Sequence, residues 1–241
     1  MKASVVVPAY NEERLLPESL ACIRASMEAF DRAGWSSELI VCDNNSSDRT
    51  AGIAREFGAR VVFEPVNQIA RARNRGAADA SGDWLFFVDA DSYPSLALMT
   101  DAVIAVRSGR CLAGGATIAV DSQRRSLRAA IAVWNAISRL NRWAAGSYVF
   151  CEAQAFRAVG GFSESMYIAE EIGLFRRLKK LARQQRRRIV ILSDHPLLTS
   201  GRKAHLYTQR DVLRFYMQIV RTGGRALRTR EGAFFWYDGR R

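Results

Sequence analysis

The stretch Trp84-Leu85-Phe86-Phe87-Val88-Asp89-Ala90-Asp91 ends a run of bulky apolar residues abruptly in two carboxylates. The run is short and rich in aromatic residues, and it lies between Gly82 and Pro94, which predicts a buried strand. Residues i and i+2 of an extended chain point to the same side, so Asp89 and Asp91 project together if the strand geometry continues. Two such carboxylates repel each other unless a cation lies beside them, and hard oxygen ligands suit Mg²⁺ or Mn²⁺. The alternative is a pair of solvated loop aspartates that cap the next helix.

Strand and helix patterns alternate through the first hundred residues. Strands are expected at residues 4–8, 38–43, 60–63 and 84–88, with helices at 12–32, 47–57 and 67–80. This order predicts a mainly parallel, doubly wound α/β sheet, in which ligands bind at the carboxyl ends of the strands. The polar segments at 8–12, 43–48 and 89–92 are expected to converge there.

The second half is less regular. Helices are expected at residues 96–106, 126–143, 168–181 and 211–221, strands at 111–120 and 188–192, and a turn at Gly160-Gly161-Phe162. No internal repeat or linker divides the chain, so a single domain is expected over residues 1–241.

The composition is that of a globular protein with a strong excess of positive charge. The formal charge is +12, from 36 Lys and Arg against 24 Asp and Glu, and the arginines cluster at residues 124–128, 183–188 and 221–241. Such a balance favours polyanionic partners: nucleic acid, anionic lipid or phosphorylated substrates. Neither a bilayer-spanning segment nor a secretory leader is evident, so a cytoplasmic protein is expected.

The four cysteines show no spacing typical of a zinc site or a redox motif. They are Cys22, Cys42, Cys111 and Cys151. Small core residues in a reducing compartment are the simplest interpretation.

Five segments in order resemble the motifs of family 2 glycosyltransferases, which have the GT-A fold. They are residues 4–13, residues 38–50, Ala72-Arg73-Asn74-Arg75-Gly76, Asp89-Ala90-Asp91, and Val159-Gly160-Gly161-Phe162 followed by Ala169-Glu170-Glu171. The resemblance covers roughly residues 3–180 and implies a single Rossmann-like domain with helices flanking the sheet. Within it, residues 1–110 would bind a nucleotide sugar and residues 111–205 an acceptor, and residues 206–241 would form a helix with a basic and aromatic tail.

The resemblance implies inverting transfer of one sugar from a nucleoside-diphosphate sugar, UDP-linked by default, to an acceptor hydroxyl, with Mn²⁺ or Mg²⁺. The physical argument agrees, because a divalent cation stabilises the charge of the departing diphosphate. The segment Gln218-Ile219-Val220-Arg221-Thr222 resembles the Gln-x-x-Arg-Trp of processive synthases but lacks the tryptophan, so single transfer is expected.

The resemblance also assigns residues to the donor and the metal. Asp91 is the first metal ligand, and Asp89 contacts the metal or the ribose. Tyr10 offers a face for base stacking, Asp43 accepts from a base N–H or ribose hydroxyl, and Arg73 pairs with phosphate or orients Asp89. Further donor contacts are expected from Pro8, Ala9, Glu12 and Ala90.

Inverting transfer needs a base on the side opposite the leaving group. The family usually has Glu-Asp where this chain has Glu170-Glu171, and Glu171 takes the base position. The alternative is that both are first-turn acids that complement the helix dipole.

Residues near the C-terminal end offer weaker signals for the same site. His195 or His205 would be an additional metal ligand, although a surface histidine is favoured for both. Arg202 and Lys203 could contact the diphosphate from a loop that closes over the donor.

Two other classes of protein stay open. A nucleotidyltransferase that makes nucleotide sugars would share the fold and the metal, but residues 8–12 lack its Gly-rich, basic phosphate loop. A non-enzymatic polyanion-binding protein would use the +12 charge, but nothing resembles a nucleic-acid reading module, so no nucleic-acid partner is expected.

The Arg-rich amphipathic segment 124–143 and the aromatic run 234–237 also have two interpretations. They could rest on an anionic membrane at its cytoplasmic face, where the acceptor would be lipid-linked rather than a small glycan. Alternatively, the apolar stripe packs on the sheet or on the second subunit of a homodimer.

Overall fold

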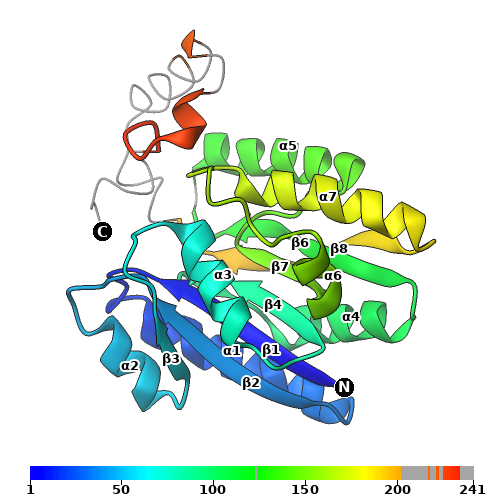
Figure 1. Ribbon diagram of the computed structural model, residues 1–241, viewed down its shortest axis with the longest axis horizontal. Coiled ribbons are helices and arrows are strands. Elements are labelled where there is room, and N and C mark those ends of the chain that lie inside the picture. Colours follow the sequence, from blue (N-terminus) through cyan, green and yellow to red (C-terminus); the bar gives the residue numbers. More distant parts are fainter. Residues whose placement is uncertain (123, 202–216, 218–220, 223–224, 234–241) are drawn as a thin grey trace.

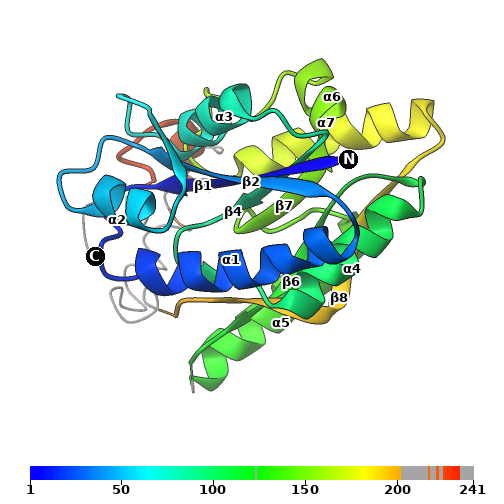
Figure 2. The ribbon, with the colours of Figure 1, turned by 90° about the horizontal axis from the view of Figure 1, so that it is seen from below.

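The computed structural model describes residues 1–122, 124–201, 217, 221–222 and 225–233. One eight-stranded sheet runs through them in the order β3-β2-β1-β4-β7-β6-β8-β5. Figure 2 shows α3, α6 and α7 over one face of this sheet and α1 and α4 over the other. The expected α/β class and flanking helices are therefore confirmed. None of the helices in this described part is long and apolar enough to span a bilayer.

The first half matches the expected alternation of strands and helices. The parallel strands β1 (Lys2–Ala9), β2 (Ser36–Asp43), β3 (Arg60–Phe63) and β4 (Trp84–Val88) are joined by α1 (Leu16–Arg32), α2 (Thr50–Glu56) and α3 (Ile69–Asp79). Helix α1 begins later than its pattern predicts. The amides of Leu15 and Leu16 both donate to the Glu12 carbonyl, which forms a turn ahead of the helix.

The second half departs further from expectation. Its elements are β5 (Ser92–Tyr93), α4 (Leu96–Arg107), β6 (Cys111–Val120), α5 (Arg125–Asn141), β7 (Tyr148–Glu152), α6 (Ala153–Ala158), α7 (Glu170–Gln184), β8 (Arg188–Thr199) and the 3₁₀ turn η1 (Arg225–Arg228). Sequence analysis missed β5, β7 and α6. Strand β7 is antiparallel to both β4 and β6, so the sheet is parallel in its first half and mixed beyond it. Strand β8 continues past Leu192 because the β6–β8 ladder resumes after an irregularity between Ala116 and Ile118.

Several expected features lie outside the described residues. They are the helix at 211–221 apart from isolated positions, most of the segment 218–222, the aromatic run 234–237, and Arg202, Lys203 and His205.

Adjacent phenylalanines of β4 support the two cores on opposite faces of the sheet. Phe86 lies 4.9 Å from Phe30 and 5.7 Å from Phe150 between ring centroids. Phe87 points the other way and lies 5.2 Å from Phe156 and 5.0 Å from Phe162. A strand that is covered by helices on both faces reads as a continuous apolar run, as this one does.

The cysteines are all free thiols, and three of them belong to the interior. Cys42, Cys111 and Cys151 are buried, as expected for small core residues, whereas Cys22 is half-buried. Burial raises the pKa of the Cys42 and Cys111 thiols to about 12, so both are protonated at neutral pH.

Helix α3 lies unusually close to the sheet. A Cβ atom at Gly76 would lie 2.4 Å from Cγ1 of Val6 on β1, which is nearer than atoms can approach. Glycine is therefore required for this contact. The contact fixes the height of α3 above β1, and with it the position of Arg73 one turn earlier.

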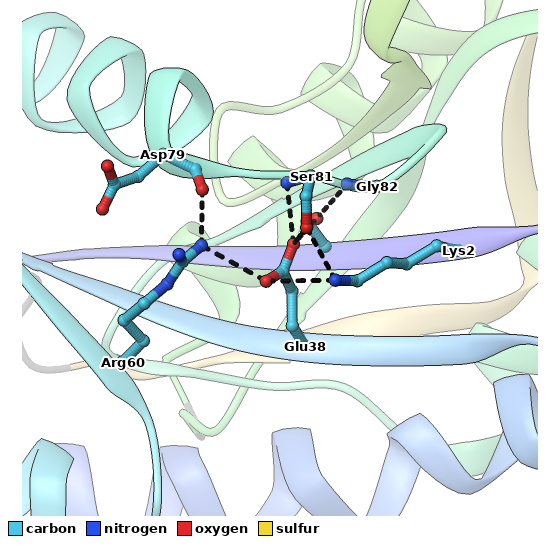
Figure 3. A network of polar contacts seen from close by, with 7 residues as sticks. Lys2, Glu38, Arg60, Asp79, Ser81 and Gly82 are labelled. Carbon is cyan, nitrogen blue, oxygen red and sulfur yellow. Dashed lines mark hydrogen bonds and ion pairs between the residues drawn. The ribbon is translucent and has the colours of Figure 1, made fainter.

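A polar network fastens the amino ends of the strands (Figure 3). Glu38 on β2 accepts hydrogen bonds from Ser4 Oγ at 2.6 Å and from the amide and hydroxyl of Ser81, both at 2.8 Å. It also pairs with Lys2 at 3.5 Å and with Arg60 at 3.2 Å. Burial alone would raise the pKa of Glu38, but the serine hydrogen bonds and the Lys2 charge lower it to about 2.

Glu38→Gln is expected to lower the free energy of unfolding at pH 7 by about 2 kcal/mol, because the depressed pKa stabilises the folded state. This contribution is complete above the ordinary Glu pKa of 4.5 and is lost as the pH falls through the folded value of about 2. Urea unfolding at pH 7 and pH 3 measures it. Glu28→Gln, which breaks a surface i,i+4 pair with Arg32, is the control and should cost under about 0.5 kcal/mol. Equal losses in the two variants would contradict a special role for Glu38.

Candidate active site

The carboxyl ends of β1, β2 and β4 meet at one edge of the sheet. Ala9 lies opposite Asp43 in the β1–β2 ladder. In the β1–β4 ladder Val6 lies opposite Phe87, and continuing that register places Pro8 level with Asp89. The structure thus brings together the three polar segments that were expected to converge.

The loop after β1 is held by the loop after β2. Asn11 adopts a left-handed backbone with φ of 50°. Its amide donates to Ser46 Oγ at 3.0 Å, and its side-chain oxygen accepts from the Ser47 amide at 2.8 Å. The Glu12 amide donates to Thr50 Oγ1 at 2.8 Å. These contacts organise the loop before any ligand arrives.

The predicted donor residues all lie on this edge but differ in exposure. Tyr10 is half-buried, whereas Pro8, Ala9, Glu12 and Ala90 are buried. The buried carboxylate of Asp43 accepts a hydrogen bond from the Ser46 amide at 3.1 Å. It therefore stabilises the loop that follows β2.

Arg73 on α3 is the centre of the site. Its side chain is 1% exposed. Nη1 donates to Glu170 Oε1 at 2.5 Å, and Nη2 donates to Asp89 Oδ1 at 2.7 Å and to the Gly146 carbonyl at 2.8 Å. Burial would lower the pKa of Arg73, but the charges of Asp89 and Glu170 outweigh it and raise the pKa. Of the two predicted roles for Arg73, the structure supports orientation of Asp89.

Glu170 and Glu171 begin α7 and face different surroundings. Ala169 before them has a left-handed backbone with φ of 61°, a strained conformation for alanine. Glu170 is buried in its ion pair with Arg73, whereas Glu171 is half-buried. A Cβ atom at Gly146 would lie 3.2 Å from Arg73 Nη2 and 3.6 Å from Glu171 Cδ, so both groups flank this glycine.

The pKa values of the two carboxyls are both raised above the ordinary value for glutamate. Burial raises the pKa of both, and for Glu170 the Arg73 charge opposes this effect. For Glu171, burial and the neighbouring Glu170 raise the pKa to about 8. Both residues do lie in the first turn of α7, as the helix-dipole alternative requires. However, Glu170 also forms an ion pair with Arg73 on α3, so this residue does more than complement the dipole of α7.

The neighbouring residue of α3 fixes the turn before α7. Asn74 accepts from the Phe162 amide and donates to the Phe162 carbonyl, both at 2.9 Å. Gly161 has φ of 63°, and a Cβ atom there would lie 2.7 Å from Asn74 Oδ1. Arg177 on α7 donates to the Val159 carbonyl at 2.9 Å and to the Gly161 carbonyl. The segment Ala72–Gly76 therefore connects the sheet, the carboxylate pair and the acceptor-side turn.

Sequence analysis missed two backbone carbonyls of the site. Gly146 O accepts from Arg73, and Ser147 O accepts from the Asp89 amide at 3.2 Å. The run of small residues Ala144-Ala145-Gly146-Ser147 was the available signal, since small residues allow a close backbone approach.

The donor chemistry of Asp89 and Asp91 fits a hard divalent cation. Over the described positions, no group of three or more His, Cys, Asp or Glu is arranged to hold a metal ion. A cation held by two carboxylates must complete its coordination with other oxygens, and Mg²⁺ and Mn²⁺ do so with phosphates and water. Asp89 Oδ1 is held by Arg73 at 2.7 Å, so the orientation of this carboxylate is fixed by the protein.

The structure places His195 beside helix α4. Its Nδ1 lies 2.8 Å from Asp101 Oδ2 on α4. The end of β8 near Asp91 is Thr199, which pairs with Ser92, and the Ser200 amide donates to the Asp91 carbonyl. His195 lies four residues back along the chain, in the irregular part of the β6–β8 ladder between Leu192 and Leu197. The strand was expected to end at Leu192, before His195, whereas β8 includes His195 and continues to Thr199.

Comparison with known proteins decides the family. The model described as "Glycosyl transferase family 2" matches residues 4–159, which is more than half of the chain. The chain belongs to glycosyl transferase family 2. The resemblance found in the sequence motifs is thereby confirmed.

Curated relatives match part of this family 2 chain. "Probable glycosyltransferase YdaM" of Bacillus subtilis is 35% identical over 39% of the chain and 23% of its own length. "Dolichol-phosphate mannosyltransferase" of Pyrococcus furiosus is 30% identical over 48% of the chain and 33% of its own length. The chain thus spans a third or less of these two proteins.

Solved structures confirm the GT-A fold. S. aureus TarS 1-349 in complex with UDP-GlcNAc has a TM-score of 0.66 at 21% identity, covering 83% of this family 2 chain and 59% of that one. Glucosyl-3-phosphoglycerate synthase from Mycobacterium tuberculosis, in complex with Mn²⁺, UDP-glucose and phosphoglyceric acid, has a TM-score of 0.56 at 21% identity, covering 82% and 71%.

Arg73→Lys is expected to lower the free energy of unfolding by about 3 kcal/mol, because one ammonium cannot hold two buried carboxylates and a carbonyl. Arg71→Lys is the matched control two residues away on α3. Arg71 pairs with Glu164 at 3.1 Å on the surface, so this change should cost under about 0.5 kcal/mol. Urea unfolding measures both, and similar small losses would show that the Arg73 network does not hold the site together.

Proposed function

We propose that this chain is a metal-dependent, inverting glycosyltransferase that moves one sugar from a UDP-sugar to an acceptor hydroxyl. The observation that carries this proposal is the position of Arg73, which joins Asp89 of the predicted metal pair to Glu170 beside the predicted base. Fold neighbours with bound UDP-sugar, one also with Mn²⁺, support the donor class and the metal.

The donor half is proposed to be residues 1–110. Tyr10 stacks on the nucleotide base, and Asp43 and Glu12 accept from base or ribose groups. Pro8, Ala9 and Ala90 bring the backbone close to the nucleotide. A divalent cation held by Asp91 and Asp89 supplies positive charge where the diphosphate departs. Arg73 keeps Asp89 in place by a buried ion pair, so its orientation does not depend on the ligand.

The acceptor half is proposed to be residues 111–205, with Glu171 as the general base. Glu171 removes the proton of the acceptor hydroxyl while that oxygen bonds to the anomeric carbon. The bond from this carbon to the diphosphate oxygen breaks on the opposite face, which inverts the configuration. The carboxylate of Glu170, ion-paired with Arg73, raises the pKa of Glu171 by its negative charge.

The two alternative classes of protein, a nucleotidyltransferase and a polyanion-binding protein, account for fewer features of the site. A nucleotidyltransferase needs a basic, Gly-rich phosphate loop after β1, where this chain has Pro8-Ala9-Tyr10-Asn11-Glu12. A polyanion-binding protein would gain nothing from a carboxylate edge that repels phosphates. The homodimer and the contact with an anionic membrane stay predictions, and both concern α5.

Calorimetric titration of UDP, GDP, CDP and dTDP, with and without Mn²⁺, tests the donor site. UDP is expected to bind most tightly, and only when both Mn²⁺ and Asp91 are present. Asp91→Asn should weaken binding at least about tenfold, because it removes one of two charged ligands. Asp83→Asn, in the turn before β4, is the control. Binding of no nucleotide under any condition would overturn the proposal.

Glu171→Gln is expected to lower kcat by about 10³-fold while UDP affinity is unchanged, because it removes the base alone. In the wild type, kcat/KM should rise with pH and level off above about 8, since only deprotonated Glu171 accepts a proton. Glu164→Gln, in the exposed turn before α7, serves as the control. An undiminished kcat in the Glu171→Gln variant would exclude Glu171 as the base.

A further inference from the structure

Helix α5 is amphipathic but buries little of its surface. Leu127, Ile131 and Trp134 are half-buried, and Asn135 bonds both backbone groups of Ile118 on β6, at 3.0 and 2.9 Å. These contacts attach one side of α5 to the sheet. Ser138 is the one residue of the helix that is fully buried. Figure 2 shows α5 at the periphery of the molecule.

The outer side of α5 carries an exposed aliphatic stripe, formed by Ala130, Val133, Ile137 and Leu140. These positions are three, four and three residues apart, which places them on one side of the helix. Val133 is 60% exposed and Leu140 is 86% exposed. The single apolar stripe expected from the sequence is therefore divided: its first part packs on β6, whereas Ile137 and Leu140 face solvent.

Positive charge dominates the two chain segments that lie at the stripe. Residues 122–151 contain five arginines and no Asp or Glu. Residues 172–193, which include most of α7, contain eight Lys and Arg and no Asp or Glu. Two long segments of one sign make a local field that attracts anions.

The two basic segments meet at the end of the stripe. Trp143, three residues after Leu140, has Arg176 at 5.7 Å and Lys179 at 5.3 Å from its ring centroid. Lys179 also donates to the Asn141 carbonyl at the end of α5. Burial and the charges of Arg183, Arg142 and Arg176 lower the pKa of Lys179, as expected for cations that lack neutralising partners nearby.

We propose that the α5 stripe and the cations at its C-terminal end, Arg142, Arg176, Lys179 and Arg183, form a docking face for an anionic lipid surface. Aliphatic side chains that enter the headgroup boundary, with arginines beside them, are the pattern of an interfacial helix. The inference concerns a surface of the protein and does not depend on the proposed transferase activity.

Lipid fits this face better than the other occupants. A second copy docked on the same patch would set arginines against arginines, since neither basic segment offers a carboxylate. Nucleic acid is bound through basic grooves with aromatic stacking, whereas this stripe is aliphatic. The face also lies close to the site, because Trp143 is followed by the loop whose Gly146 carbonyl accepts from Arg73.

Co-sedimentation of the full chain with vesicles of phosphatidylcholine, with and without phosphatidylglycerol, tests the docking face. Binding is expected only to the anionic vesicles, and it should weaken at high salt. Leu140→Asp should weaken binding about tenfold because it removes the most exposed apolar contact. Arg142→Gln with Arg183→Gln should weaken it about 25-fold, at about fivefold for each charge.

Matched controls lie on α4. Ile104, 62% exposed, and Arg107 repeat the chemistry of the tested positions on another face of the molecule. Ile104→Asp and Arg107→Gln should leave vesicle binding unchanged, and circular dichroism should show every variant folded. Failure of the wild type to bind at low salt would overturn the proposal, as would equal losses in the α4 variants. A dimer that Leu140→Asp dissociates, without vesicle binding, would assign the stripe to a second copy.

Discussion

One buried guanidinium sets the geometry of the site. Arg73 gives one nitrogen to a carboxylate at the end of β4 and the other to a carboxylate at the start of α7. An arginine enclosed by protein stays charged and is costly to leave unpaired, so both carboxylates must be supplied in the right places. The position of Arg73 depends in turn on the close approach of α3 to β1 at Gly76. The chemistry proposed for this protein therefore depends on how tightly one helix packs on one strand.

The first half of the fold could be predicted because short-range sequence patterns determine its helices and strands. The strands at Arg60–Phe63 and Trp84–Val88 have the expected bounds, since each is an apolar run between clear turn signals. The pair Phe86-Phe87 already indicates a strand covered on both faces. The sequence motif around Arg73 also predicted an ion pair correctly. Sequence analysis named Asp89, which is one of the two carboxylates that Arg73 contacts.

The features that sequence analysis could not predict depend on contacts between distant parts of the chain. Strand β7 is a short run after small residues, and nothing in its pattern shows that it enters the sheet antiparallel between β4 and β6. Glu170 and Glu171 are identical residues next to each other in the sequence. Their side chains point in different directions from α7, so that Glu170 is ion-paired and Glu171 is half-buried. The position of His195 within β8 follows from the full length of that strand, which its apolar run understates.

The position of β7 also determines the order in which the protein can assemble during its synthesis. During synthesis, the strands β1, β2, β3 and β4 can pair with one another as soon as the first half of the chain has been made. Strand β6 pairs with no strand made before it, because both of its partners, β7 and β8, follow it along the chain. Until Tyr148–Glu152 leaves the ribosome, β4 and β6 each keep an apolar edge without its partner, separated by α5. A nascent chain paused in this interval has the exposed strand edges that chaperones recognise and that aggregation exploits.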